Sequence, residues 1–279
     1  MGIYKLTIPA WKIATRQRKL ILYSILLSYL ASPAPVAGAG ASCIQLEADE
    51  VFVRNSSEFH KAIRELEPGT TILLAPGSYQ GGLYLHAIAG TKEAPVVIRG
   101  ADPNNPPLFT GGRQAIHLSD CSYVILSNLK AKAFPSNGIN IDDGGSYETP
   151  AHHIILENLT ILETGPWGNH DALKMSGVDY FQVRHCYFEG WGGSGIDMVG
   201  CHHGVVEDST FVGRNGFSQS NAIQLKGGTE DILVQTCFFK NAGQRSINLG
   251  GSTGLQFFRL SRWQSLTCGV TAPDAQQLD

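Results

Sequence analysis

The side chains best suited to chemistry recur inside one short phrase of the sequence. The phrase reads small residue, apolar residue, polar residue, apolar residue, and its copies follow one another at steps of 23, 34, 23, 27 and 24 residues. The central polar residues mix amides, acids and bases. Such a mixture is typical of clefts that bind sugars along a solenoid, although the outward residues of any strand can simply be solvated. These residues are His117, Asn140, Lys174, Asp197, Gln224 and Asn248.

Two further positions flank this row and widen it to a polar face. The position after the phrase holds Ser119, Asp142, Ser176, Val199, Lys226 and Gly250, and the position before it holds Gln114, Asn137, Asp171, Ser194, Asn221 and Arg245. Two tryptophans lie on expected loops just before Lys174 and Asp197, where a ring can stack on a sugar or cover a corner of the chain. The expected substrate-binding residues are Asn140, Lys174, Asp197, Asn221, Gln224, Asn248, Trp167 and Trp191.

The elements that must position this face follow from a second repeated phrase. It places apolar residues two apart, as at Val124 and Leu126 or at Ile154 and Leu156. This alternation indicates strands with one buried face, and no helical pattern separates the strands. The sequence therefore predicts an all-β fold, a single-stranded right-handed parallel β-helix solenoid. Equivalent residues of successive coils should then stack about 4.8 Å apart.

The repeats change character at both ends. Residues 57–66 predict a short N-terminal capping helix that covers the open end of the first coil. Its apolar side is formed by Phe59, Ala62, Ile63 and Leu66. We expect the β-helix to occupy residues 42–259. Residues 260–279 lack the ladder pattern, so we expect an irregular tail there, as at a truncated end.

Residues 1–41 have the pattern of a signal peptide. A basic group at residues 16–19 precedes an apolar run, Leu20 to Leu30, and small residues follow. We expect cleavage and a secreted or periplasmic monomer with no membrane association afterwards; an uncleaved anchor is the alternative. The net charge of -3 offers no basic patch, so nucleic acid is not an expected partner.

The cysteines fit the repeat better than they fit disulfides. Cys186 and Cys237 share one ladder position two coils apart, about 9.6 Å by the strand spacing. A disulfide requires Cα atoms within about 7 Å of each other. Cys121 and Cys201 also match each other across several coils. We therefore expect these four residues to be small buried side chains.

Two stretches near the start of the repeats carry a family resemblance. Residues 67–79, EPGTTILLAPGSY, and residues 90–98, GTKEAPVVI, resemble the opening of exported β-helix polysaccharide lyases. The chain thus resembles the pectate-lyase-like β-helix superfamily, and within it the family of chondroitinase B and alginate lyases is the most similar. In outline the resemblance spans Val51 to Gly251.

The resemblance also implies catalytic roles. That family places a catalytic Lys on one coil and a catalytic Arg on the next, which here would make Lys226 the Brønsted base and Arg245 the acid or electrostatic partner. The two side chains should then converge in one groove. The family's calcium-binding acids are replaced by Gln219 and Asn221, which are poor substitutes for carboxylates. The sequence therefore establishes no cofactor: it leaves calcium open and does not identify the residues that would bind a metal.

Three functions remain open from these observations. The resemblance implies an exported protein that cleaves an acidic, uronate-containing polysaccharide by β-elimination. The missing acids equally suit a non-catalytic glycan-binding or surface β-helix protein. A glycoside hydrolase would instead use paired acids, chosen from Asp142, Asp143, Asp171 and Asp197.

Overall fold

The computed structural model describes residues 50–146 and 148–259. All described residues belong to one compact unit. The expected signal peptide and the expected irregular tail therefore lie outside the described residues. Within the described part, no helix is long and apolar enough to cross a membrane.

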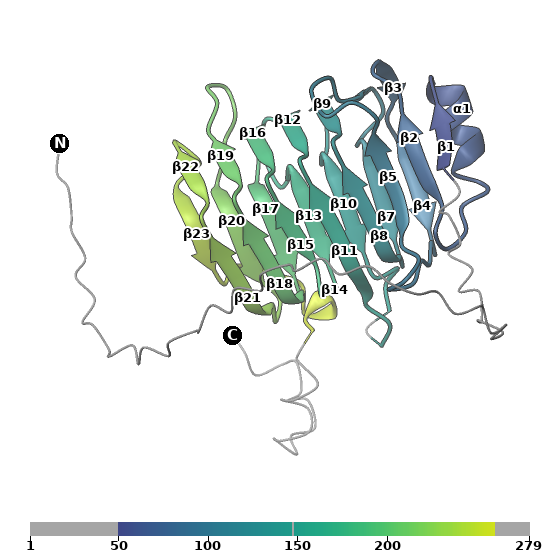
Figure 1. Ribbon diagram of the computed structural model, residues 1–279. Helices are drawn as coiled ribbons and strands as arrows, with labels where there is room; N and C mark the ends of the chain where they lie inside the picture. Colours follow the sequence, from purple (N-terminus) through teal and green to yellow (C-terminus); the bar gives the residue numbers. More distant parts are fainter. Residues whose placement is uncertain (1–49, 147, 260–279) are drawn as a thin grey trace, which may run out of the picture. The chain divides into compact units, whose positions relative to one another are not determined.

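The described residues form a solenoid with three parallel sheets (Figure 1). The first sheet contains β1 (Glu50–Val53), β2 (Thr71–Leu74), β5 (Val96–Gly100), β8 (Ser122–Ser127), β11 (Ala151–Glu157), β14 (Val178–Asp179), β15 (Gln182–Arg184), β18 (His202–Glu207) and β21 (Glu230–Gln235). The second contains β3 (Ser78–Gln80), β6 (Leu108–Thr110), β9 (Lys130–Phe134), β12 (Thr160–Thr164), β16 (Tyr187–Trp191), β19 (Thr210–Val212) and β22 (Phe238–Lys240). The third contains β4 (Leu83–His86), β7 (Ile116–Ser119), β10 (Ile139–Asp142), β13 (Leu173–Ser176), β17 (Ser194–Val199), β20 (Asn221–Lys226) and β23 (Arg245–Leu249).

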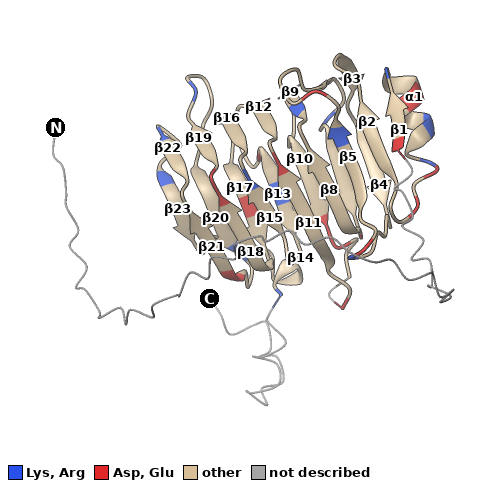
Figure 2. Ribbon diagram, viewed as in Figure 1, with Lys and Arg blue, Asp and Glu red and all other residues tan. Residues whose placement is uncertain are grey.

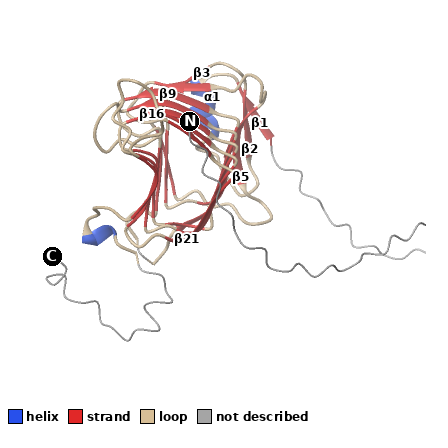
Figure 3. Ribbon diagram, turned by 90° about the vertical axis from the view of Figure 1, so that its left-hand side faces the viewer, coloured by secondary structure: helices blue, strands red, loops and turns tan. Residues whose placement is uncertain are grey.

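The register of the third sheet confirms the repeat predicted from the sequence. The six copies of the first phrase pair with one another: Ile116 opposes Ile139, and the pairing continues coil by coil to Ile247. Seen along the solenoid, the strands enclose an interior (Figure 3), and apolar side chains fill it in ladders. Phe211, for example, stacks between Phe188 at 4.9 Å and Phe239 at 5.2 Å, measured between ring centroids.

The four cysteines of the described part behave as expected. Cys121, Cys186 and Cys201 are buried, Cys237 is half-buried, and all four are free. Burial raises the pKa of the Cys186 thiol to about 12, so this thiol is neutral and acts as a small packed side chain.

The capping helix is present but shorter than predicted. It is α1 (Ser56–Ala62), and the side chain of Asn55 caps it by accepting a hydrogen bond from the backbone N–H of Glu58 at 2.9 Å. Phe59 is fully buried. The helix ends early because the next N–H groups bond three residues back, Arg64 to Lys61 and Glu65 to Ala62, which tightens the last turn.

The other end of the solenoid differs from the sequence expectation. The last strand ends at Leu249, so the repeat stops ten residues before the predicted position 259. Residues 250–259, which we call the C-terminal strap, include the 3-10 helix η1 (Leu255–Phe257). Arg259 holds the strap in place: its backbone N–H donates to Gly227 O at 2.9 Å, and its Nη1 donates to Gly200 O at 3.2 Å. The strap thereby covers part of the outer face of the third sheet.

Candidate functional site

Four charged side chains meet on the outer face of the third sheet. They are Asp171, Lys174, Asp197 and Lys226, which we call the charge cluster. Lys174 on β13 and Asp197 on β17 are directly paired in register, and Lys226 ends β20 on the following coil. Lys174 Nζ donates to Asp197 Oδ2, and Lys226 Nζ lies 3.1 Å from the same oxygen. Basic and acidic residues accordingly lie side by side around β13 and β17 (Figure 2).

The two carboxyl groups of the charge cluster are withdrawn from solvent. Asp171 and Asp197 are both 0% exposed. Burial, and then the negative charge of Asp197, raise the pKa of Asp171. Burial alone would lower the pKa of Lys174, but the charges of both carboxyl groups outweigh it and raise that pKa, so Lys174 stays protonated. Within the described residues, Asp171 Oδ2 and Asp197 Oδ1 have no hydrogen-bond partner.

The local sequence makes room for Asp171 beside the next coil. Asp171 lies in the turn before β13, where its Oδ1 accepts a hydrogen bond from the backbone N–H of Ser194 at 2.7 Å. A Cβ atom at Gly193 would lie 2.6 Å from that same oxygen. Glycine at position 193 therefore allows the carboxyl group to approach the backbone of β17.

Both ammonium groups face a cavity of about 320 Å³ between the sheet and the strap. Lys174 and Lys226 line one side, with 18% and 13% of their side chains exposed. The remaining lining residues are Asn169, Ser176, Val199, Ser252, Thr253, Gly254 and Phe257. The lysines are thus the charged groups that a ligand entering this cavity would meet, while the two acids lie behind them.

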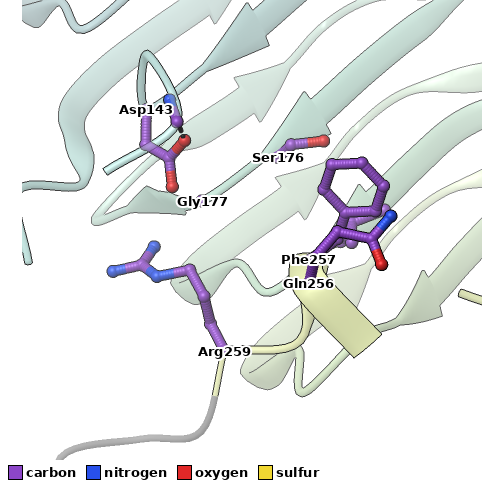
Figure 4. Close-up of a pocket in the computed structure, with 8 residues that line it drawn as sticks. Asp143, Ser176, Gly177, Gln256, Phe257 and Arg259 are labelled. Atoms are coloured by element: carbon purple, nitrogen blue, oxygen red, sulfur yellow. Dashed lines mark hydrogen bonds between the residues drawn. The ribbon is translucent and has the colours of Figure 1, made fainter. Parts of the chain in front are cut away.

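A second cavity, of about 310 Å³, adjoins the first (Figure 4). Asp143 and Arg259 line it, and Phe257 and Ser176 line both cavities. Burial raises the pKa of Asp143. Arg259 lies 3.5 Å from Asp179, and only 9% of its side chain is exposed, so its guanidinium is used mainly to seat the strap.

Three predicted binding amides are close together but bond mainly to one another. Asn221 Nδ2 donates to Gln224 Oε1 at 2.6 Å, and Asn248 Nδ2 donates to the same oxygen at 3.2 Å. Gln224 in turn donates to Gly250 O. Asn221 and Gln224 are buried. This network stiffens the last coils and leaves few amide groups free for a ligand.

The predicted convergence of Lys226 and Arg245 is wrong. Arg245 is paired in register with Asn221, at the opposite end of β20 from Lys226. The two positions are five residue steps apart along the strand direction, which corresponds to about 16 Å. Lys226 is instead ion-paired with Asp197, and Arg245 is exposed at the start of the last strand.

The expectation for Trp191 is also wrong, whereas Trp167 lies where a loop residue should. Trp191 belongs to β16, is 0% exposed, and donates from Nε1 to Asn221 O at 2.7 Å. Its ring is part of the core and cannot stack on a ligand. Trp167 is 64% exposed on the loop before β13. Asn140 lies on the predicted row, one coil before Lys174.

The residues that replace the family's calcium-binding acids do not form a calcium site. The Gln219 side chain is bonded to backbone groups of its own loop, accepting from Arg214 N and donating to Phe217 O. Asn221 contributes a single unpaired oxygen, Oδ1. The described residues contain no group of three or more His, Cys, Asp or Glu side chains that could hold a metal ion.

Sequence reasoning missed a second polar cluster on the same sheet, around His117 and Asp142. Both residues stood in the predicted polar face, but nothing in their spacing distinguished them from solvated positions. The predicted stacking of the repeats could have brought them together, since His117 and Asp142 are diagonal neighbours on adjacent coils.

Comparison with solved structures gives three similar chains. An alginate lyase from Paenibacillus sp. str. FPU-7 is 16% identical over 73% of this chain and 98% of its own, with a TM-score of 0.38. The catalytic domain of a GH87 alpha-1,3-glucanase is 13% identical over 77% of this chain and 41% of its own, with a TM-score of 0.51. A mannuronic acid specific family 6 lyase from human gut microbiota is 17% identical over 72% of this chain and 54% of its own, with a TM-score of 0.43.

The family itself is identified by sequence. No curated protein matches the chain. The family described as the right handed beta helix region matches residues 114–266, which is more than half of the sequence. The matched residues include six of the seven strands of the third sheet, from β7 to β23, with the charge cluster. The chain therefore belongs to the right-handed β-helix family.

Proposed function

We propose that this chain is a carbohydrate-active β-helix protein that binds an acidic polysaccharide through Lys174 and Lys226. One observation carries the proposal: the two ammonium groups converge on one oxygen of Asp197 and line the same cavity of about 320 Å³. A uronate carboxylate in that cavity would accept hydrogen bonds from both ammonium groups.

The charge balance of the cluster favours an anionic ligand. Two lysines, of which Lys174 has a raised pKa, contact Asp197, and the second carboxyl group of the cluster, Asp171, has a raised pKa that favours its neutral form. Because both acids are buried behind the lysines, the cavity side of the cluster is positive. The ion pairs hold the ammonium groups in place before a ligand arrives, which reduces the entropy lost on binding.

The fold suits a long ligand. A solenoid presents an extended face along its axis, on which successive units of a polymer can meet successive coils. The GH87 alpha-1,3-glucanase domain that shares this fold has been solved in complex with tetrasaccharides.

Binding can be tested by calorimetric titration of the full chain with alginate, pectate and dermatan sulfate, and with a neutral glucan for comparison. Lys226→Ala should weaken binding of an acidic polymer about tenfold or more, because one charge-assisted hydrogen bond is lost. Lys240→Ala is the matched control, since Lys240 is an exposed lysine on β22 of the second sheet. Equal losses for the two variants, or equal binding of the neutral glucan, would contradict the proposal.

Cleavage by β-elimination is a second candidate at the same cavity. It is favoured by the two amino groups that line the cavity, because Lys174 can neutralise the uronate carboxylate while Lys226, in its neutral form, takes the proton α to it. The electron pair of that C–H bond forms the double bond, the bond to the glycosidic oxygen breaks, and water protonates that oxygen. Arg245 has no part in this scheme.

The two candidates are separated by the unsaturated product, whose ultraviolet absorbance reports elimination directly. A rise that Lys226→Ala abolishes and Arg245→Ala leaves unchanged would establish the lyase reaction. Binding of an acidic polymer with no rise in absorbance would identify a glycan-binding protein.

A further inference from the structure

Asp142 is the most heavily hydrogen-bonded carboxylate on the third sheet. It accepts from His117 Nε2 at 2.5 Å, from Ser119 Oγ at 2.7 Å, from Asn140 Nδ2 at 3.0 Å and from Gly144 N at 3.1 Å. Burial would raise its pKa, but the hydrogen bonds from His117 and Ser119 outweigh burial and lower it. An ionised Asp142 thus fixes the imidazole ring of His117.

An exposed aromatic ring stands next to this pair. Tyr84 on β4 lies edge-on to His117, with ring centroids 5.0 Å apart and an interplanar angle of 69°. Tyr84 is 59% exposed, and the ring of His86 on the same strand lies parallel to its ring, with centroids 6.0 Å apart. Exposed tyrosines that are held in one orientation offer an apolar surface with a polar tip, which matches the surface of a sugar ring.

The register places this group in line with the charge cluster. Tyr84 opposes His117, His117 opposes Asn140, Asn140 opposes Lys174, and Lys174 opposes Asp197. The strands that carry them lie side by side in Figure 1, and β20 is the next strand of the sheet. Lys226 is the last residue of β20. Five strand spacings separate β4 from β20, which is about 24 Å along the solenoid axis. A path of that length accommodates several sugar units.

We propose that Tyr84, His117 and Asn140 form a second sugar-binding subsite, so that the polysaccharide lies along the solenoid axis from Tyr84 to Lys226. Tyr84 packs against the face of a sugar ring, and the polar groups of His117 and Asn140 meet its hydroxyls. The acidic sugar lies at the other end, on Lys174 and Lys226. This inference rests on the proposed binding of an acidic polysaccharide and gives that site its direction and its minimum length.

The test uses acidic oligosaccharides of graded length, prepared from the polymer that binds best, in calorimetric titrations of the full chain. Tyr84→Ala should weaken binding of long oligosaccharides about fivefold. It should leave a disaccharide unaffected, because a disaccharide spans only the lysine end. Tyr84→Phe keeps the ring and should bind like the parent chain. Tyr180→Ala is the matched control. Tyr180 is comparably exposed, at 53%, but lies between β14 and β15 of the first sheet, away from the proposed path on the third sheet.

The outcomes distinguish the subsite from the function on which it rests. If Lys226→Ala weakens binding and Tyr84→Ala has no effect at any length, the subsite is wrong and the proposed function stands. If Tyr84→Ala weakens the disaccharide as much as the long oligosaccharides, the axial path is wrong. If neither substitution changes binding of any acidic ligand, both proposals fail. Thermal unfolding of each variant shows that the comparison is made on folded protein.

Discussion

The outer faces of the third and the first sheet stabilise their polar side chains in different ways. Both must place large polar side chains on strands whose inner faces fill the core. On the third sheet, charged groups pair with one another beneath the C-terminal strap, and Asp197 is 0% exposed. Outside the first sheet, rings stack from coil to coil in the order Tyr123, His153, Tyr180, His203, at centroid distances of 4.3, 5.2 and 4.7 Å.

The two faces also differ in backbone conformation. The four residues of the aromatic stack all have positive φ angles, between 52° and 55°. This left-handed conformation costs a residue other than glycine about 1–2 kcal/mol. The stack therefore repeats one bent backbone in each coil, and the ring contacts offset part of its cost. The charge cluster has Lys174, Asp197 and Lys226 on regular strands, and its cost is the burial of acids. The stack is thus a structural device of the bent strands of the first sheet, whereas the charge cluster places cationic groups beside a cavity.

The sharpest contrast should come from removing one acid on each face. Asp197→Ala leaves two lysines facing each other without their shared counterion, and we expect the free energy of unfolding to fall by about 3 kcal/mol or more. Asp231→Ala removes a carboxylate whose side chain is 73% exposed and which bonds to His203 at 2.6 Å; its effect should stay within about 0.5 kcal/mol. Urea unfolding of both variants measures the difference, and similar losses would remove the distinction between the faces.

The repeat made the fold predictable from the sequence. The site was harder to predict, because some of its features depend on residues that depart from the repeat. The phrase around Lys174 and Asp197 predicted their pairing, because equal offsets in a solenoid mean adjacent coils. The same offsets already separated Lys226 from Arg245 by five positions along a strand, which the family resemblance obscured. The burial of Asp197 was not predictable, since its carboxyl group lies behind Lys174 and Lys226, and the spacing of the repeat does not show how these long side chains fold over it. Trp191 was misplaced because β16 continues one residue past Gly190, whose φ of 70° departs from an ordinary strand.

A smaller effect is expected from the aromatic stack. Tyr180→Ala removes two ring contacts, to His153 and to His203, and should lower the free energy of unfolding by about 1–2 kcal/mol. Tyr180→Phe keeps both contacts and should be close to neutral. Binding of acidic polysaccharide should not change in either variant. A loss of binding in Tyr180→Ala at unchanged stability would show that the stack, too, meets the ligand.

The smallest and most diagnostic effect is the response of each face to pH. The hydrogen bond to Asp179 raises the pKa of His202, on β18 of the first sheet, so folding favours the charged imidazole. Its contribution to stability is fully present below pH 6.5 and is lost as pH rises through the raised pKa. The pKa of Asp142 is lowered, so its contribution is present above pH 3.8 and is lost as pH falls through the lowered pKa.

In unfolding experiments at a series of pH values, His202→Gln should reduce the loss of stability on the alkaline side, and Asp142→Asn should reduce the loss on the acidic side. Each slope should stay below about 1.4 kcal/mol per pH unit, because one proton is involved. If both substitutions altered the same side of the profile, the two faces would share one network, and the contrast between them would not hold.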